Sequence, residues 1–450
     1  MKKYYISTFG CQMNVHDSEK MAGILKSEGY TETDSAKNAN IVIFNTCSIR
    51  QKAEQKFFSE LGRIKSLKQK RPDLKIAVTG CIAQQEGARL LQRASHVDYV
   101  IGPQNINALK SVVAVNQNAG IIAVEDNPYI ADMELPADRK DGVRAWVNIM
   151  YGCNNFCSYC IVPYTRGREK SRASQNIINE IKELSEKGYK EVTLLGQNVN
   201  SYKSNINFPE LLKEINKINK IKRIRFVTSH PKDLSDDLIY AIRDLDKVCE
   251  HIHLPLQSGS SKILALMNRR YTYEDYQKKI EKLRLEIPEI AITSDIIAGF
   301  PQETDEDHKE TIRALAEIEF DGIYAFKFSP RQGTKASTMN EQISDDIKSE
   351  RLAKILELQN EITERKNREL KGTQEEVLVE GHDDKNTGKF KGRTRTNKIV
   401  NITLKNNIKL TDNIKSGDFV IVKIIGPLRH SLEGEIVYIS HEDSCLNPWM

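Results

Sequence analysis

The residues with the clearest capacity for chemistry are three closely spaced cysteines, Cys153, Cys157 and Cys160. Three thiolates on one short loop can hold an iron-sulfur cluster. A 4Fe-4S cluster needs four ligands, so this loop leaves one iron open to a small chelating molecule. The alternative is a structural zinc site, which would need a fourth Cys or His nearby. The next candidates are as distant as His230 and Cys249, so the spacing favours the cluster.

Three further cysteines, Cys11, Cys47 and Cys81, come at the ends of apolar runs that read as strands. These runs are residues 4–9, 41–46 and 74–79, with a helix expected after the first from 16 to 28 and after the second over 53–64. The alternation predicts a doubly wound parallel sheet, in which the carboxyl ends of the strands share one edge. We therefore expect the three cysteines to meet there and share a second 4Fe-4S cluster. The alternative is that they are small apolar residues of the core.

The composition is that of a globular protein of two or three domains. The chain has 450 residues, of which 39% are hydrophobic and 29% charged. Its longest apolar runs are too short for a membrane span, its first residues read as a strand rather than a leader, and eight cysteines are too few for a disulfide framework. We expect a cytoplasmic protein that makes no membrane contact. The net charge of +5 barely favours an anionic partner.

The chain divides into three units and a linker. Residues 1–123 form the cysteine-bearing sheet, with a further strand over 97–101 and a helix over 106–115, and the polar stretch 124–142 reads as a linker. In residues 143–371, six strands alternate with amphipathic helices, which predicts a partial (βα)6 barrel of the TIM type. These strands are 143–150, 191–195, 224–227, 251–254, 292–297 and 322–326. A long helix over 345–370 leads to residues 372–440, where strands 376–380, 398–403, 419–425 and 434–439 predict a small β-barrel.

Polar residues follow several strands of the predicted partial barrel, where its chemistry should lie. Gln197, Ser258 and Asp295 are the candidates for binding a cofactor, and turn or helix-cap roles are the alternative. His230 and His253 are expected to be structural.

Two basic segments could bind a phosphate backbone. Arg166, Arg168, Lys170 and Arg172 alternate with other residues just after the Cys153 loop, and Lys389, Lys391, Arg393 and Arg395 do so in the C-terminal unit. In an extended strand such alternation places all the cations on one face. This favours nucleic acid as a partner, and a solvated face is the alternative. Cys249 and Cys445 fit neither cysteine set and are expected to play no part.

The run from Tyr151 to Cys160 resembles the signature of the radical S-adenosylmethionine (SAM) enzymes, including the aromatic Tyr159 before the last cysteine. In that family SAM chelates the open iron, and an electron from the cluster splits SAM to give a 5′-deoxyadenosyl radical. The resemblance implies that Gln197, Ser258 and Asp295 contact SAM.

The motifs at Thr8–Asn14, Asn45–Arg50 and Thr79–Cys81, together with Tyr151–Arg172, extend this resemblance over the whole chain to the methylthiotransferases. Those enzymes join a domain with an auxiliary 4Fe-4S cluster to a radical SAM barrel and an OB-like β-barrel, TRAM, that binds tRNA. The branch that looks most similar, the MiaB type, modifies isopentenyl (dimethylallyl) adenosine next to the anticodon. The resemblance implies methylthiolation of adenine C2, with the cluster on Cys11, Cys47 and Cys81 carrying the sulfur and a second SAM donating the methyl group.

The resemblance further implies an electron donor such as flavodoxin or ferredoxin, and we expect a monomer. Two alternatives stay open. One is a sister methylthiotransferase that acts on threonylcarbamoyl-adenosine in tRNA or on a ribosomal protein aspartate. The other is an iron-sulfur protein that binds nucleic acid and senses redox state without catalysis.

Overall fold

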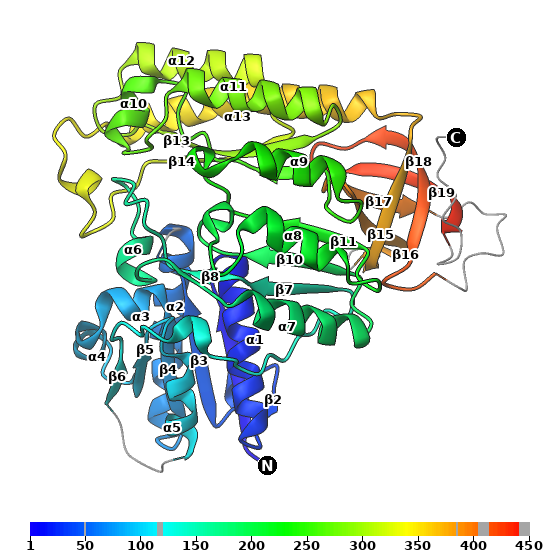
Figure 1. Cartoon of the computed structure of the whole chain (residues 1–450). Coiled ribbons are helices and arrows are strands. Elements are labelled where there is room, and N and C mark those ends of the chain that lie inside the picture. The colour runs from blue at the N-terminus through cyan, green and yellow to red at the C-terminus, as the bar shows by residue number, and fades with distance from the viewer. Residues whose placement is uncertain (49–50, 115–119, 384–385, 404–413, 441–450) are drawn as a thin grey trace.

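The computed structural model describes residues 1–48, 51–114, 120–383, 386–403 and 414–440. An N-terminal α/β unit lies beneath a partial barrel, and a closed β-barrel lies at the far end of the chain (Figure 1). Among the described helices, none is long and apolar enough to cross a membrane. Cys445, the last residue of the helix expected over 106–115, and the last two residues of the motif at Asn45–Arg50 lie outside the described residues.

The N-terminal unit is a six-stranded parallel sheet in the order β2-β1-β3-β4-β5-β6. Its helices cover both faces, because α1 and α5 pack on one apolar cluster and α2 and α4 on another. The predicted doubly wound sheet is therefore confirmed. Its strands are β1 (Lys3–Thr8), β2 (Thr31–Glu32), β3 (Ile41–Thr46), β4 (Lys75–Gly80), β5 (Tyr99–Ile101) and β6 (Ile121–Ala123). Its helices are α1 (Gln12–Ser27), α2 (Gln51–Lys70), α3 (Cys81–Glu86), α4 (Ala88–Arg93) and α5 (Leu109–Ala114), with 3-10 turns η1 (Ala36–Asn38) and η2 (Ile106–Ala108).

Two local expectations in this unit differ from the structure. Helix α1 begins at Gln12 rather than at residue 16, because Cys11 already occupies its N-cap. The stretch 124–142, expected as a linker, contains a 3-10 turn, η3 (Ile130–Asp132), that buries Ile130 against Tyr151. Few apolar residues mark this stretch in the sequence, so its packing was not visible there.

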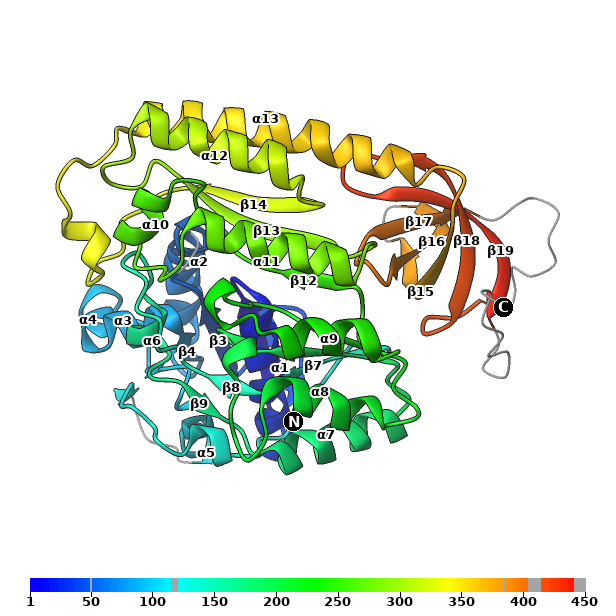
Figure 2. The same cartoon turned by 45° about the horizontal axis from the view of Figure 1, so that its top comes forward.

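The central unit has the six predicted parallel strands, arranged as two half-sheets in the orders β11-β10-β7 and β12-β13-β14. A bridge from Ile224 to Val248 links the halves. Figures 1 and 2 show α12 and α13 side by side over β13 and β14. The strands are β7 (Arg144–Asn148), β10 (Glu191–Leu195), β11 (Arg223–Phe226), β12 (His251–His253), β13 (Ala291–Ala298) and β14 (Gly322–Lys327), and a short ribbon pairs β8 (Met150–Tyr151) with β9 (Lys170–Ser171).

The helices of this unit alternate with its strands, as the sequence predicts. They are α6 (Val162–Thr165), α7 (Ser174–Glu186), α8 (Phe208–Asn216), α9 (Asp236–Asp244), α10 (Ser261–Leu266), α11 (Tyr273–Glu286), α12 (Asp305–Ile318) and α13 (Asp345–Glu369), with 3-10 turns η4 (Val199–Ser201), η5 (Pro231–Asp233) and η6 (Lys335–Thr338). Capping boxes start α8, α11 and α12, where Asn207, Thr272 and Thr304 accept hydrogen bonds from the first turn.

The C-terminal unit is a closed barrel in the order β15-β16-β17-β19-β18, which confirms the predicted small β-barrel. Its strands are β15 (Gln374–Asp383), β16 (Asn386–Thr394), β17 (Ile399–Thr403), β18 (Phe419–Pro427) and β19 (Leu432–Ser440). Buried apolar residues that include Val377, Val400 and Val422 fill the barrel.

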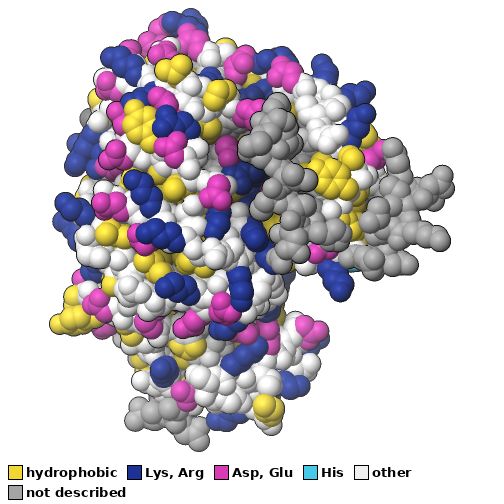
Figure 3. Space-filling view, turned by 45° about the vertical axis from the view of Figure 1, so that its right-hand side comes forward, with side chains coloured by type: hydrophobic (Ala, Val, Ile, Leu, Met, Phe, Trp, Pro, Cys, Tyr) yellow, Lys and Arg dark blue, Asp and Glu magenta, His cyan; other side chains and the backbone are white. Residues whose placement is uncertain are grey.

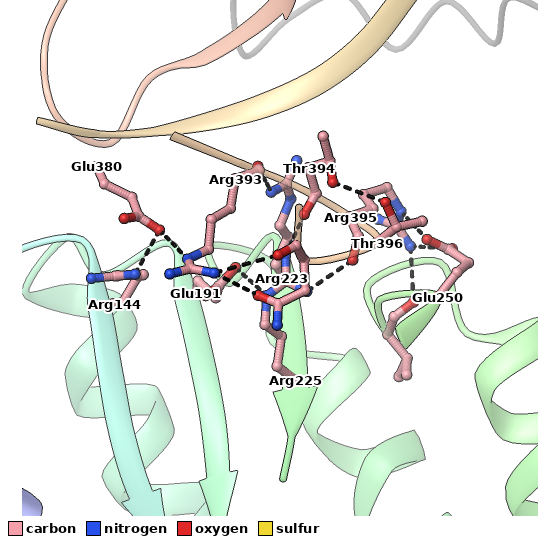
Figure 4. A network of polar contacts seen from close by, with 12 residues as sticks. Arg144, Glu191, Arg223, Arg225, Glu250, Glu380, Arg393, Thr394, Arg395 and Thr396 are labelled. Carbon is pink, nitrogen blue, oxygen red and sulfur yellow. Dashed lines mark hydrogen bonds and ion pairs between the residues drawn. The ribbon is translucent and has the colours of Figure 1, made fainter. Parts of the chain in front are cut away.

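Buried arginines join this small barrel to the amino ends of the central strands (Figure 4). Arg223 on β11 is 0% exposed and donates to the carbonyl oxygen of Arg393 at 2.7 Å. Arg225 on the same strand donates to the carbonyl oxygens of Thr394 and Arg395 at 2.7 and 2.8 Å. These bonds engage backbone groups of the small barrel, so they fix its position as well as its orientation.

Candidate cysteine centres and nucleic-acid contacts

The three cysteines of the N-terminal sheet lie together at its carboxyl edge. Cys47 and Cys81 directly follow the adjacent strands β3 and β4, and Cys11 comes three residues after β1, on the other side of β3. A Cβ atom on Gly10 would lie 2.9 Å from the Sγ atom of Cys47, and one on Gly80 would collide with the carbonyl oxygen of the residue before Cys47. Glycine alone permits these approaches, which bring all three cysteines to one corner.

Positive charge surrounds this corner. Cys11 is the N-cap of the 16-residue helix α1, whose N-terminal end favours an anion. The guanidinium of Arg166, 6% exposed, interacts electrostatically with Cys11 and Cys81. It donates to Oδ1 of Asn14 at 3.1 Å and to Oδ2 of Asp17 at 2.9 Å. The corner is therefore suited to hold thiolates and a cluster of negative charge.

The other three cysteines lie on the loop between β8 and α6. Phe156, between the first two of them, has a φ of 49°, a left-handed conformation that is strained for a residue with a side chain. Gly152 has a φ of 67°, and a Cβ atom there would collide with the carbonyl oxygen of Arg168. The amide of Cys153 donates to the carbonyl oxygen of Gly167 at 3.2 Å. The segment that follows the cysteines thus folds back and clamps their loop.

Residues 266–270, which we call the support loop, hold the cysteine loop from the other side. Two of its carbonyl oxygens accept hydrogen bonds from the hydroxyl and the amide of Ser158, at 2.8 and 3.0 Å. The side-chain amide of Asn268 donates to the carbonyl oxygens of Asn155 and Phe156, at 3.3 and 3.0 Å. Asn268 itself has a φ of 58°. This contact explains how the strained conformation at Phe156 is maintained.

Arg269 of the support loop places a buried cation beside the cysteines. Its guanidinium is 3.3 Å from Sγ of Cys157 and 3.3 Å from the hydroxyl of Tyr159. It also donates to the hydroxyl of Tyr271 and to the carbonyl oxygen of Pro255. No carboxylate among the described residues pairs with it. A buried cation without an anionic partner is costly, so this site calls for negative charge at the cysteines.

Burial favours the protonated form of two thiols of this loop, those of Cys153 and Cys160, when no metal is bound. Burial raises the pKa of Cys153 above its ordinary value. Burial, and then the neighbouring Cys157, raises the pKa of Cys160 to about 12. Metal ligation replaces these protons, so binding is coupled to proton release.

The two cysteine sets lie on adjoining surfaces. Helix α3 begins with Cys81 and packs against α6, which begins two residues after Cys160. Beside this contact is a pocket of about 320 Å³ lined from both units, including Gln84 and Tyr164. The ammonium group of Lys20 on α1 also donates to the hydroxyl of Tyr151 at 3.0 Å.

The chemistry of the donors in both cysteine sets suits iron-sulfur clusters. The described residues contain no group of three or more His, Cys, Asp or Glu side chains arranged around one ion. A 4Fe-4S cluster takes its thiolates at separate irons, so its ligands do not converge on one point. Each set here consists of three cysteines alone, which is the soft donor type that such clusters use.

The three candidate SAM contacts occupy different environments. The amide of Gln197 donates to Sδ of Met13, a residue of α1, and its Oε1 is buried without a partner in the described structure. Asp295 lies on β13, with Oδ1 3.5 Å from Nε2 of His253. Ser258 is buried and its hydroxyl contacts Thr311, which favours the turn role. His230 accepts a hydrogen bond from a backbone amide of η5.

The basic segment after the cysteines is not the extended, one-sided run that its alternation predicts. Its start is helical, in α6, and the four cations that follow have different environments, from the buried Arg166 and Arg172 to the exposed Arg168. Arg166 and Arg172 are buried in ion pairs, so the charge of Arg166 is used inside the protein, which does not favour its predicted contact with nucleic acid. Arg168 is exposed and stacks on the ring of Phe156 at 4.2 Å.

Basic and buried residues alternate along β16 of the C-terminal barrel, as predicted. Phe390, Gly392 and Thr394 are buried, and the basic residues between them are partly exposed. These basic residues do not form a free face. Arg393 pairs with Glu380 at 2.7 Å within the small barrel, and Arg395 pairs with Glu250 at 2.6 Å, which holds the small barrel to the central unit (Figure 4). Lys389 approaches Glu433 at 3.8 Å. On the face in Figure 3, basic and acidic side chains are interspersed.

Sequence reasoning missed Asn268 and Arg269. They lie more than 100 residues from the cysteines that they support, and nothing near them in the sequence marks a site. Cys249 is buried and lies in neither cysteine set, as expected.

Three family models match consecutive parts of the chain. They are the uncharacterized protein family UPF0004 over residues 3–102, the radical SAM superfamily over 147–315 and the TRAM domain over 368–437. Each coincides with one of the three structural units.

Curated proteins match nearly the whole chain. A tRNA-2-methylthio-N(6)-dimethylallyladenosine synthase of Thermodesulfovibrio yellowstonii is 59% identical over 96% of this chain and 98% of its own length. A protein with the same name from Thermoanaerobacter pseudethanolicus is 49% identical over 97% of this chain and 93% of its own length. At these identities the relatives share one family with the chain.

Solved structures share the fold at much lower identity. The radical SAM methyltransferase TsrM from Kitasatospora setae, with cobalamin and a [4Fe-4S] cluster bound, has a TM-score of 0.55 at 14% identity, covering 75% of this chain and 77% of that one. The cobalamin-dependent radical SAM enzyme OxsB, with aqua-cobalamin and SAM bound, has a TM-score of 0.53 at 11% identity, covering 81% and 56%. These likenesses concern the fold alone.

Proposed function

The chain belongs to the tRNA-2-methylthio-N(6)-dimethylallyladenosine synthase family of radical SAM enzymes, and on that basis we propose that it methylthiolates dimethylallyl-adenosine in tRNA. The modified atom is C2 of the adenine next to the anticodon, and the product is 2-methylthio-N6-dimethylallyladenosine. The strongest support is the 59% identity, over nearly the full length of the chain, to a relative of that name. The two cysteine sets on adjoining surfaces support it further.

A 4Fe-4S cluster and SAM are the cofactors of the radical SAM superfamily. Cys153, Cys157 and Cys160 are the residues that would hold this cluster. We propose a second 4Fe-4S cluster on Cys11, Cys47 and Cys81, with a free iron for the sulfur to be transferred. When bound, the two clusters and SAM supply the radical chemistry needed at the adenine C2–H bond, which is neither acidic nor readily displaced.

The protein's own residues position and shield these groups. The support loop and Gly152 fix the conformation of the Cys153 loop, and Arg269 places positive charge beside it. Arg166 places positive charge beside Cys11 and Cys81, and its hydrogen bond to Asp17 joins the central unit to the N-terminal unit. Burial keeps water from four of the thiols, at positions 47, 81, 153 and 157, while Cys11 and Cys160 are more accessible. Gln197 and Asp295 at the barrel mouth stay candidates for binding SAM.

The tRNA would contact the exposed Arg168 beside the cysteine loop and, at the other end of the central strands, the small barrel. Lys389 and Lys391 on β16 are partly exposed, and Lys391 makes no ion pair with a described residue. Arg395 contributes by fixing the small barrel to the central unit through Glu250, and Arg393 pairs with Glu380 inside that barrel. Phosphate contacts of this kind position an RNA without reading its sequence.

The electron for each turnover would come from a small redox carrier such as flavodoxin or ferredoxin. We expect the enzyme to act as a monomer in the cytoplasm, where its tRNA substrate is found.

The test is an assay of the anaerobically reconstituted protein with SAM, a reductant and an anticodon stem-loop RNA that carries dimethylallyl-adenosine. We expect the methylthiolated nucleoside on digestion and mass spectrometry. RNA with threonylcarbamoyl-adenosine serves as the second substrate. Product from that RNA alone would assign the chain to the sister activity. Absence of SAM cleavage in protein shown to hold both clusters would favour a redox-sensing role without catalysis.

A further inference from the structure

Strand β14 exposes two large aromatic side chains on one face. Tyr324 is 58% exposed and Phe326 is 44% exposed, whereas Ile323 and Ala325 pack against the apolar core under the helices. Because side chains alternate along a strand, Tyr324 and Phe326 point away from that core. Helices α12 and α13 cover the outer side of this half-sheet (Figure 2), so the two aromatic rings face the interior of the partial barrel.

The neighbours of these rings on β13 connect them to the cysteine loop. In the parallel register, Ile297 is the partner of Phe326 and Asp295 is the partner of Tyr324. Partners in neighbouring strands share a face of the sheet. Ile297 packs in the same apolar cluster as Tyr159, the residue before Cys160. The aromatic face therefore begins next to the cysteines and runs along β14 into the barrel.

Polar groups lie at the Tyr324 end of this face. The ring of His253 is 5.9 Å from the ring of Tyr324 in an edge-to-face arrangement, and Nε2 of His253 is 3.5 Å from Oδ1 of Asp295. This aromatic wall and the imidazole of His253 have the chemistry of a site for a heterocyclic base, and Asp295, a candidate for binding SAM, lies at the edge of that site. Aromatic side chains bind unstacked bases of RNA in this way.

We propose that Tyr324 and Phe326 form the wall that recognises the dimethylallyl-substituted adenine of the substrate. The inference rests on the proposed function, which supplies an occupant with both a flat base and a branched apolar group. Two adjacent exposed aromatic residues leave apolar surface in water, and covering them with five apolar carbons is favourable. The wall selects the substrate because an adenosine without the substituent leaves this surface uncovered.

The test compares two anticodon stem-loop RNAs, one with dimethylallyl-adenosine and one with unmodified adenosine, on wild-type protein and on Tyr324→Ala and Phe326→Ala. We expect each variant to lower kcat/KM for the dimethylallyl RNA by about 10- to 100-fold, in the range that hydrophobic pockets give for small apolar groups. The preference over the adenosine RNA should fall by a similar factor. Tyr324→Phe, which retains the ring, should keep the preference.

Two controls separate this inference from other readings. SAM cleavage without RNA should be unchanged in both alanine variants. Tyr129→Ala, which removes a 70% exposed tyrosine far along the chain from β14, should behave as wild type. An equal loss on both RNAs would overturn the inference, because the wall would then not recognise the dimethylallyl group. A loss of RNA-free SAM cleavage would also overturn it and would assign the wall to SAM. Wild-type protein that cleaves SAM but modifies neither RNA would overturn the proposed function itself.

Discussion

The guanidinium of Arg166 and the carboxylate of Asp17 form a buried ion pair, 2.9 Å apart. It joins the segment after Cys160 to helix α1, which follows Cys11. Both side chains are almost fully buried. Arg166 also interacts electrostatically with Cys11 and Cys81, so this one residue ties the segment after Cys160 to the N-terminal cysteine set. Their relative position is therefore set by a specific polar contact rather than by apolar packing alone.

Breaking the ion pair between Arg166 and Asp17 should lower the stability of the N-terminal unit. Asp17→Asn leaves the charge of Arg166 buried without its partner, which costs about 3–5 kcal/mol in comparable pairs. We expect a lower urea midpoint for unfolding of the N-terminal unit. Asp17→Asn/Arg166→Gln should recover part of the loss, since no charge is then stranded. Glu214→Gln, at the exposed pair with Lys217, serves as the control and should leave the midpoint unchanged.

Each cysteine set should hold its own share of iron. Replacement of Cys153, Cys157 and Cys160 by alanine should leave about half of the iron and sulfide of anaerobically purified protein, because the other three cysteines hold a separate 4Fe-4S centre. Replacement of Cys11, Cys47 and Cys81 should leave the other half. Cys249→Ala is the matched control and should retain all of it. Loss of all iron in either triple variant would contradict two independent clusters.

Arg269 should tune the reduction of the cluster at the barrel. Its buried charge lies 3.3 Å from Sγ of Cys157 and favours the more negative, reduced state. In protein that lacks the N-terminal cysteines, Arg269→Met should lower the equilibrium constant for one-electron reduction by about tenfold or more, which corresponds to about 59 mV. Arg269→Lys keeps the charge and should shift it less. A redox titration followed by electron paramagnetic resonance measures the reduction potential of each variant. A potential of Arg269→Met equal to that of the parent protein would contradict the electrostatic role.

The sequence was sufficient for the fold because its signals were local. Apolar runs ending in Cys47 and Cys81 define neighbouring parallel strands, and their shared edge follows from topology. The partners of the basic residues could not be predicted in the same way. Arg166, Arg393 and Arg395 look like free cations in sequence, but each meets a carboxylate, and the partners of Arg166 and Arg395 are 149 and 145 residues away in the chain. A charge pattern shows which face a residue occupies and leaves open what covers that face.

Acid should destabilise the protein through His251. Burial, and then the charge of Arg225, lowers the pKa of this histidine to about 3, whereas it is near 6.5 in an unfolded chain. Between those values only the unfolded state binds the proton, so stability is lost as the pH falls through this window, by up to about 1.4 kcal/mol per pH unit. His251→Gln should show a shallower decline of the urea midpoint between about pH 7 and about pH 4. If the urea midpoint of His251→Gln fell with pH as steeply as that of the wild type, His251 would not be the group responsible.

The position of the small barrel should matter for RNA binding more than for SAM chemistry. Arg223 is fully buried and holds this barrel through the carbonyl oxygens of Arg393 and Glu376. Arg223→Met keeps most of the side-chain volume and leaves Glu376, which is 39% exposed, free to meet water. We expect faster proteolytic release of the C-terminal barrel and a several-fold higher KM for tRNA, with kcat and RNA-free SAM cleavage nearly unchanged. Arg365→Met on the exposed side of α13 is the control. A fall in kcat at constant KM would show instead that these arginines act on the catalytic centre.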